Sequence, residues 1–142
     1  MSAADAFQFV NPLVIPGWLM LVFMPRSQWT RIVATFVIPS VLAVVYLTLL
    51  ATNKPPDGAG FGSLEQVTLL FSNPWILLAG WIHYLAFDLF VGAWEVRDAQ
   101  RLKISHLLVV PCLIFTFMIG PVGLGAYFVL RLVMIRRQTA AA

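Results

Sequence analysis

The sequence predicts an all-α, polytopic membrane protein with four transmembrane helices and short loops. Hydrophobic residues make up 61% of the chain, charged residues only 11%, and the mean hydropathy is +0.89. A soluble domain carries about 25% charged residues, so this chain has too little polar surface to face water on all sides. Its 142 residues suffice for four spans and short loops. We therefore expect a single transmembrane domain over residues 1–142.

The first two spans are predicted over residues 7–24 and 31–52. Asn11-Pro12 and Pro16-Gly17 predict a bend in the first span, because proline removes a backbone hydrogen bond from the helix. Pro39 interrupts the second span in the same way. The sequence thus predicts a kinked first helix.

A loop and a short helix separate the second and third spans. Residues 53–62 are rich in glycine and proline, which is typical of a loop. Ser63 is a typical helix N-cap, and the helix expected over residues 64–71 is too short to cross a bilayer. We expect it at the membrane interface. The third span is predicted over residues 75–96.

The fourth apolar stretch, residues 106–135, is longer than the roughly 20 residues that a span requires. It must tilt, extend past the lipid or break, and Gly120-Pro121 is the expected place of the kink. With this stretch as a span, the positive-inside rule leans toward both termini outside. The loops after the first and third spans carry Arg26, Arg31, Arg97, Arg101 and Lys103, against Lys54, Arg136 and Arg137 on the other side.

Several functional classes are excluded by composition and by the N-terminal region. A single cysteine, Cys112, allows neither an intrachain disulfide framework nor a CxxC motif. The first residues lack a basic region and contain Asp5, which argues against a cleaved secretory signal. No basic stripe with interleaved aromatics indicates nucleic-acid binding. We expect an integral protein of a bacterial cytoplasmic (inner) membrane.

Polar side chains gather on the third span, where ionisable groups inside a membrane are candidates for function. Helical spacing sorts them into two stripes. The first consists of Trp81, Tyr84, Asp88 and Glu95, with Gly92 nearby, and the second of His83, Phe87, Phe90, Trp94 and Arg97. These spacings predict a groove with carboxylates on its floor and aromatic rings on its wall. The predicted substrate-binding residues are Trp81, Tyr84, Phe87, Gly92 and Trp94, although Trp and Tyr residues are also common interfacial anchors.

Three residues of this span are predicted to be catalytic: Asp88, His83 and Glu95. Asp88 lies deepest, and a carboxyl removed from water favours the neutral form that a general acid needs. Its alternative role is helix packing, through a pairing with Arg97, with Arg31 or with a backbone end. Glu95 fits a solvated or salt-bridged interfacial residue equally well, and His83 fits a residue of helix packing.

No metal or cofactor is assigned to the chain. His83, Asp88, Glu95, Asp98 and His106 have the right chemistry for metal ligands, but their spacing matches no ligand motif. For Asp98 and His106 we favour a surface position. The serines lack the GxSxG context of a nucleophile.

Motifs along nearly the whole chain resemble the abscisic-acid-deficient-4-like family of small four-helix membrane proteins. They are Asn11-Pro12, Pro16-Gly17-Trp18, the run from His83 to Gly92, Trp94-Glu95, Arg97-Asp98, Ser105-His106-Leu107-Leu108, Pro111-Cys112-Leu113 and Gly120-Pro121-Val122-Gly123-Leu124. The resemblance implies carotenoid chemistry related to neoxanthin formation, in which an epoxide opens to an allenic alcohol without net redox change. Such a reaction needs an acid and a base, which Asp88 with His83 or Glu95 would supply.

The leading hypothesis is therefore an intramembrane isomerase that opens an epoxide or shifts a double bond in a carotenoid-like lipid. The alternative is a non-catalytic pigment- or lipid-binding subunit of a membrane complex. Ion transport ranks third, since four spans are few and no inverted repeat is visible. The expected partners are membrane lipid, a carotenoid or other isoprenoid ligand, and other membrane proteins, but no nucleic acid.

Overall fold

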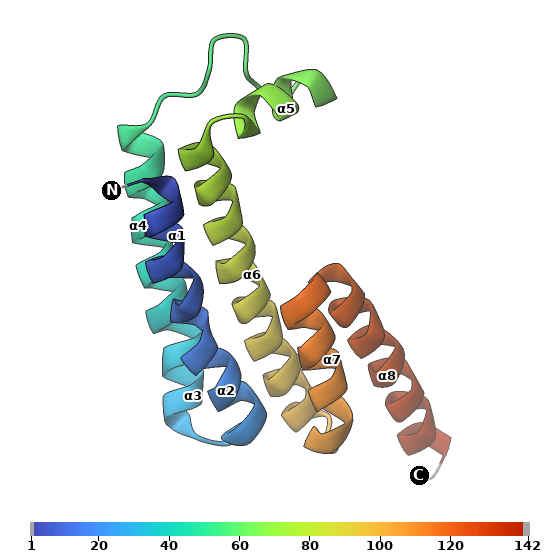
Figure 1. The fold of residues 1–142 in the computed structure, drawn as a ribbon. Coiled ribbons are helices and arrows are strands. Elements are labelled where there is room, and N and C mark those ends of the chain that lie inside the picture. Colours follow the sequence, from blue (N-terminus) through green and yellow to red (C-terminus); the bar gives the residue numbers. More distant parts are fainter. Residues whose placement is uncertain (1, 141–142) are drawn as a thin grey trace.

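The computed structural model describes residues 2–140, which fold into helices joined by turns and by one longer loop over residues 53–63. The segments are α1 (Ala3–Val10), η1 (Asn11–Val14), α2 (Ile15–Phe23), α3 (Gln28–Ile32), η2 (Val33–Val37), α4 (Ile38–Thr52), α5 (Leu64–Phe71), α6 (Pro74–Arg101), α7 (His106–Ile119) and α8 (Pro121–Ala140). Because consecutive segments run on without a break in α1–η1–α2 and α3–η2–α4, they form six continuous helices (Figure 1). The predicted all-α class is confirmed.

Three of these helices are long and apolar enough to cross a membrane. They cover Ala3–Phe23, Gln28–Thr52 and Pro74–Arg101, with 21, 25 and 28 residues. At 1.5 Å per residue each reaches the roughly 30 Å of a hydrocarbon core. The first two predicted spans agree with them to within a few residues. The third begins within one residue of the prediction, but α6 continues as helix through Arg101 instead of ending near Val96.

Both of the first two long helices change geometry beside their prolines. The first tightens to a 3-10 turn over Asn11–Val14, which contains Pro12. The second widens to a π turn over Val33–Val37, just before Pro39, and the Ile38 backbone N–H donates to the Val33 carbonyl. The helical geometry of the first helix therefore changes where the bend is predicted. The second helix accommodates its proline with a single π turn, the form in which the rare π-helix usually occurs inside α-helices.

The fourth apolar stretch breaks at Gly120-Pro121 into two helices instead of forming one span. Figure 1 shows α7 rising along α6 from the C-terminal end of α6, and α8 returning beside α7. Near the C-terminal end of α8, the Gln138 side chain donates to the Leu102 carbonyl, 2.8 Å away. The hairpin α7–α8 thus begins and ends at the same end of α6. The C-terminus consequently lies opposite the N-terminus, not on its side as expected for a fourth span.

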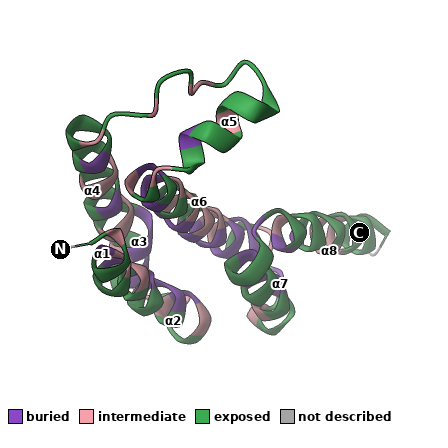
Figure 2. Ribbon diagram, turned by 45° about the horizontal axis from the view of Figure 1, so that its top comes forward, coloured by how far each residue is buried: buried purple, intermediate pink, exposed green. Residues whose placement is uncertain are grey.

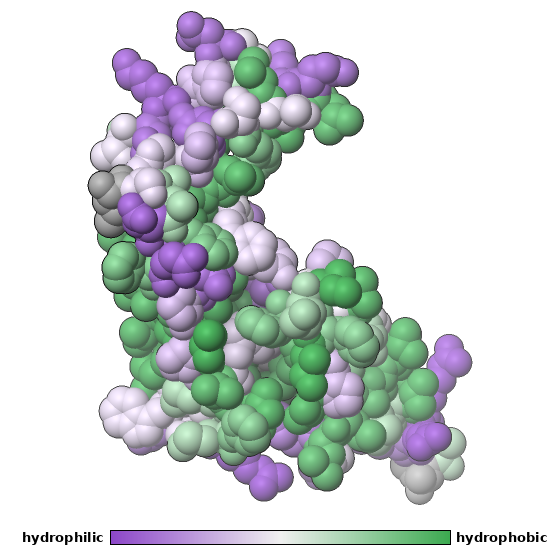
Figure 3. Space-filling view, in the orientation of Figure 1, coloured by the Kyte–Doolittle hydropathy of each residue, from purple (hydrophilic) through white to green (hydrophobic). Residues whose placement is uncertain are grey.

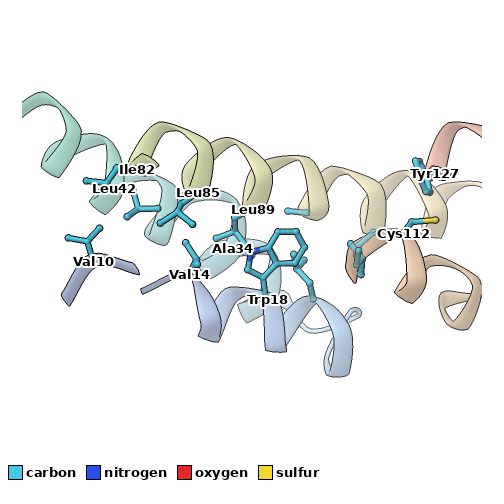
Figure 4. Packing of buried hydrophobic residues seen from close by; sticks show 14 of the residues in the cluster. Val10, Val14, Trp18, Ala34, Leu42, Ile82, Leu85, Leu89, Cys112 and Tyr127 are labelled. Atoms are coloured by element: carbon cyan, nitrogen blue, oxygen red, sulfur yellow. The ribbon is translucent and has the colours of Figure 1, made fainter. Parts of the chain in front are cut away.

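The helix α6 is the centre of the packing, since it contacts α1, α2, α4, α5, α7 and α8. Buried residues follow α6 and the inward faces of its neighbours, and exposed residues cover the outer faces (Figure 2). Val14, Leu42, Ile82 and Leu89 are almost fully buried between the first three long helices (Figure 4). Large apolar side chains such as Phe36 and Leu107 remain exposed, as expected where lipid is the solvent.

The short helix α5 occupies the predicted residues 64–71. The Ser63 hydroxyl accepts from the Gln66 backbone N–H at 3.3 Å, as an N-cap does. Eight residues are too few to cross a bilayer. In Figure 1 this helix lies across the upper end of α6, near the N-terminal end of the molecule.

Candidate functional site

Three carboxylates follow one side of α6 and meet the hairpin α7–α8 at three levels. Asp88 approaches Gly120, at the tip of the hairpin between α7 and α8. Glu95 accepts a hydrogen bond from Thr116 in α7, and Asp98 accepts one from Tyr127 in α8. Their spacings of seven and three residues place them on neighbouring sides of α6. The hairpin therefore closes over Asp88 and Glu95, which belong to the predicted stripe, and over Asp98, which the sequence predicts at the surface.

Asp88 lies against the tip of the hairpin. A Cβ atom built on Gly120 would be 2.7 Å from Asp88 Oδ1, so only a glycine permits this approach without a shift. Asp88 Oδ2 is buried and has no hydrogen-bond partner in the part of the chain that the structure describes. One turn earlier on α6, the Tyr84 hydroxyl donates to the Phe117 carbonyl, 3.2 Å away. Tyr84 and Asp88 thus converge on the last turn of α7.

Glu95 is enclosed between α6 and α7. Its side chain is 0% exposed, and Oε1 accepts a 2.9 Å hydrogen bond from the Thr116 hydroxyl. Oε2 has no partner within residues 2–140. Gly123 brings α8 so close to Thr116 that a Cβ there would overlap the Thr116 backbone. Glu95 is therefore neither solvated nor salt-bridged, which corrects the interfacial reading of this residue.

Asp98 is the best satisfied of the three carboxylates. Oδ1 accepts from Arg101 at 2.7 Å, and Oδ2 accepts from Arg131 at 2.7 Å and from the Tyr127 hydroxyl at 2.9 Å. Asp98 is only 5% exposed. The favoured surface position for Asp98 is wrong, because α8 returns beside α6 and covers it.

His83 lies in the other stripe and shares no hydrogen bond with either candidate carboxylate. Its ring is exposed, stacks on Phe87 at 4.4 Å between centroids, and lies 6.0 Å from Tyr46 of α4. Five residues separate it from Asp88, which turns it to a different side of α6. The structure thus brings Asp88 together with Tyr84 rather than with His83.

Arg97 also belongs to the stripe of His83, and it faces α3–η2–α4. Its guanidinium donates to the Thr35 hydroxyl at 2.9 Å and lies over the Phe90 ring, 5.9 Å from the centroid. Within residues 2–140 the ion pairs are those of Asp98 with Arg101 and Arg131. Asp88 therefore has no ion pair with Arg97 or Arg31.

The other predicted substrate-binding residues have partners in the fold. The Trp81 indole donates to Asn11 Oδ1 at 2.9 Å. The Trp18 ring fills the space beside Gly92, where a Cβ would come within 2.7 Å of it. Trp94 packs edge-on against Tyr127, at 5.5 Å between centroids. These contacts show how each side chain is held, but they leave its binding role a prediction.

Sequence reasoning missed the residues that α7 and α8 contribute to this site, namely Thr116, Gly120, Gly123, Tyr127 and Arg131. Among them, only Gly120 and Gly123 gave a signal in the sequence, because they lie in the Gly-Pro segment where the break is expected. Among residues 2–140, no group of three His, Cys, Asp or Glu side chains is arranged to hold a metal ion. His106, a further candidate, is half-buried, and its Nε2 lies 2.9 Å from the Val22 carbonyl.

Comparison with known proteins gives one match. No curated protein and no solved structure matches the chain. The model of the family described as ABA DEFICIENT 4-like matches residues 5–127, which include Tyr84, Asp88, Glu95 and Gly120. This match covers most of the chain and nearly all of the site described above. The chain belongs to the ABA DEFICIENT 4-like family.

Proposed function

We propose that the chain is a single-domain integral membrane protein of a bacterial cytoplasmic membrane that isomerises a carotenoid-like lipid. The three apolar helices support insertion into a membrane. The family supports the carotenoid class, since its resemblance implies chemistry of that kind. The reaction is assigned to Asp88 and Tyr84 at the hairpin tip.

The observation that carries this proposal is the buried, unpartnered Oδ2 of Asp88. A polar atom removed from water without a partner costs about 1–3 kcal/mol. Asp98 on the same helix has three donors, so the fold is able to satisfy a carboxylate completely. A carboxyl that exchanges a proton with a ligand needs instead an oxygen that no protein donor occupies.

Apolar space for a long ligand lies beside the upper part of α6 and between α2 and α7. Figure 3 shows the surface hollowed between α5 and the tip of the hairpin. A cavity of about 400 Å³ between α1 and α6 is lined by Phe7, Leu77, Leu78 and Trp81, among others. A second, of about 270 Å³, lies between α2 and α7 and includes Trp18 and Phe117. Such surfaces suit an apolar polyene.

Acid and base at the tip would open an epoxide as follows. The Tyr84 hydroxyl donates its proton to the epoxide oxygen. Asp88, which the sequence predicts as the acid, is the base in this proposal: its carboxylate removes a proton from a carbon of the adjoining chain. The electrons of that C–H bond form the new double bond as the C–O bond breaks. Proton transfer from the Asp88 carboxyl to the Tyr84 phenolate restores both groups. The product is an isomer, with no net redox change.

Glu95 and His83 fit this reaction less well. Glu95 lies two turns from Asp88, about 10 Å along α6, and is fully enclosed. His83 is on another side of the helix. Their predicted catalytic roles stay predictions, and the His83→Gln variant below tests that of His83.

A pigment- or lipid-binding subunit is the second candidate. The observation that favours it is the packing role of the predicted groove residues, since Trp18 fills the space at Gly92 and Asn11 holds Trp81. In that case the aromatic side chains hold helices together, and Asp88 serves assembly with partner proteins of the membrane.

Replacing Asp88 by Asn separates the two candidates, because Asn keeps the shape but neither donates a carboxyl proton nor accepts one as a strong base. Purified protein from a carotenoid-producing host would first be extracted and its pigments identified by chromatography and mass. We expect about one polyene per chain, and an Asp88→Asn protein that keeps the polyene but converts it at least about 100-fold more slowly.

His83→Gln is the matched control, and we expect it to convert the polyene at close to the wild-type rate. Unchanged conversion by Asp88→Asn would overturn the catalytic proposal in favour of a binding subunit. Extraction of phospholipid alone would overturn the carotenoid class.

A further inference from the structure

Positive charge is concentrated at one end of the molecule, here called the basic end. It is formed by the α2–α3 connection, the α6–α7 connection and the C-terminal half of α8. Because the hairpin returns, eight of the nine Lys and Arg residues lie at or near this end, and only Lys54 lies at the other. The Arg131–Asp98 ion pair and the Gln138–Leu102 hydrogen bond fix α8 there. Such an end is suited to an anionic leaflet.

A cavity of about 790 Å³ opens at the basic end, where α2, α6 and α7 meet. Its lining includes the side chains of Arg26, Lys103 and His106, with Ser27 and Ser105 beside them, and no acidic side chain. Within residues 2–140, neither Arg26 nor Lys103 has an ion pair or a side-chain hydrogen bond. The cavity therefore presents two cations without a counter-charge from the protein.

The backbone around the cavity points to the same kind of ligand. The helix α7 begins at the cavity, and Ser105 makes no side-chain cap to its first turn. Free N–H groups at a helix N-terminus favour an anion, phosphate above all. His106 Nε2 faces the Val22 carbonyl and so carries the proton of that bond. This leaves the other ring nitrogen for a further partner.

Lys103 occupies a backbone position that glycine normally takes. Its φ is 55°, and it is the only described residue other than glycine with a positive φ. Lys103 N–H donates to the Gln100 carbonyl, and Ile104 N–H to the Ala99 carbonyl, which is the Schellman pattern of a helix C-terminus. A lysine at this position is strained relative to glycine, and strain of this kind is often kept for function.

We infer that this cavity binds the phosphate group of an anionic membrane lipid through Arg26, Lys103 and the N-terminus of α7. We assign the phosphate to a lipid because apolar side chains surround the mouth of the cavity. There, Phe23 and Leu107 are 75% and 81% exposed. Both lie at the ends of apolar helices, so acyl chains would contact them while the headgroup enters the cavity. This inference is independent of the chemistry at Asp88.

The test is native mass spectrometry of the full chain with phosphatidylglycerol or phosphatidylcholine, repeated with inorganic phosphate as competitor. We expect one phosphatidylglycerol per chain, held at least about tenfold more tightly than phosphatidylcholine. The pair Arg26→Gln and Lys103→Gln should abolish this preference. The control pair Arg136→Gln and Arg137→Gln removes the same charge outside the cavity and should preserve it.

A single substitution separates an effect on lipid binding from an effect on folding. Lys103→Gly should melt no lower than wild type, because glycine suits the backbone there, and yet it should bind phosphatidylglycerol more weakly. Equal losses in the two pairs of variants, or no preference between the lipids, would overturn the inference. Displacement of the lipid by millimolar phosphate would show that the cavity is a site for free phosphate and not for a lipid.

Discussion

At the scale of single residues, three acidic side chains of one helix have three different environments. Asp98 has three donors, Glu95 has one, and the buried oxygen of Asp88 has none. The difference arises from the neighbouring helices, since α8 supplies Arg131 and Tyr127 near its middle and only glycine at its start. Residue type and position along the helix predict a different order, with Asp88 deepest and Asp98 at the surface.

The two arginines at Asp98 are predicted to differ in their importance for stability. Arg131 is 29% exposed, whereas Arg101 is 71% exposed. Arg131→Ala should therefore lower the free energy of unfolding by about 1.5–3 kcal/mol, as for a hydrogen bond to a charged group. Arg101→Ala should lower it by less than about 1 kcal/mol. Denaturant titration in detergent measures both, and equal losses would contradict the assigned geometry.

Thr116 is predicted to stabilise the fold by satisfying Glu95. Thr116→Val removes the only donor that residues 2–140 offer to a fully buried carboxyl, and should cost about 1–3 kcal/mol. Thr116→Ser keeps the hydroxyl and should cost less. Adding Glu95→Leu to Thr116→Val should recover most of the loss, because no buried polar group is then left unpaired. A double variant that is additively worse would show that Glu95 has another partner.

At the scale of elements, the hairpin α7–α8 depends on close approach at its glycines. Gly123 packs on the backbone of Thr116. A Cβ built on Gly125, two positions further along α8, would have no described atom within 4 Å. The two glycines are alike in sequence context and differ only in which side of α8 they occupy. They therefore make a matched pair for testing the hairpin.

Gly123→Ala and Gly125→Ala should have effects of opposite sign. A methyl group at Gly123 forces α7 and α8 apart, which should cost about 1–3 kcal/mol. At Gly125 it meets open space, and the higher helix propensity of alanine should stabilise by up to about 1 kcal/mol. Thermal unfolding of the purified variants measures the difference. Equal tolerance of both substitutions would mean that the hairpin does not close at Gly123.

At the scale of the whole molecule, the returning hairpin changes the membrane topology. A fourth span would place Arg136 and Arg137 opposite the basic loops and leave the charges nearly balanced. The hairpin instead gathers them with Arg26 and Lys103, so that the positive-inside rule predicts a cytoplasmic location for the basic end and the C-terminal end of α8. We then expect the N-terminal end of α1 on the opposite side.

Cysteine labelling tests this topology. In intact cells an impermeant maleimide should react with Asp57→Cys, in the loop before α5, but with neither Gln28→Cys nor Thr139→Cys. After permeabilisation all three should react. The native Cys112 is buried and serves as the background in the parent protein. Labelling of Thr139→Cys together with Asp57→Cys would show that the fourth stretch crosses the membrane after all.

The sequence by itself determined the membrane class, the three long helices, the short helix before α6 and the carboxylate stripe. Each of these follows from hydropathy or from helical spacing, which are local properties. It also located the break at Gly120-Pro121, because glycine and proline act on their own backbone. It also placed Asp88 and Tyr84 on one face of the helix, since residues four apart on a helix share a face.

Only the tertiary structure decided what happens after that break. A kinked span and a returning hairpin have the same hydropathy, and the choice between them depends on packing between Gly123 and Thr116. That packing buries Asp98 and Glu95, gives Tyr84 a partner in α7, and collects the basic residues at one end. These contacts join residues 20 to 40 positions apart, a separation at which helical periodicity carries no information.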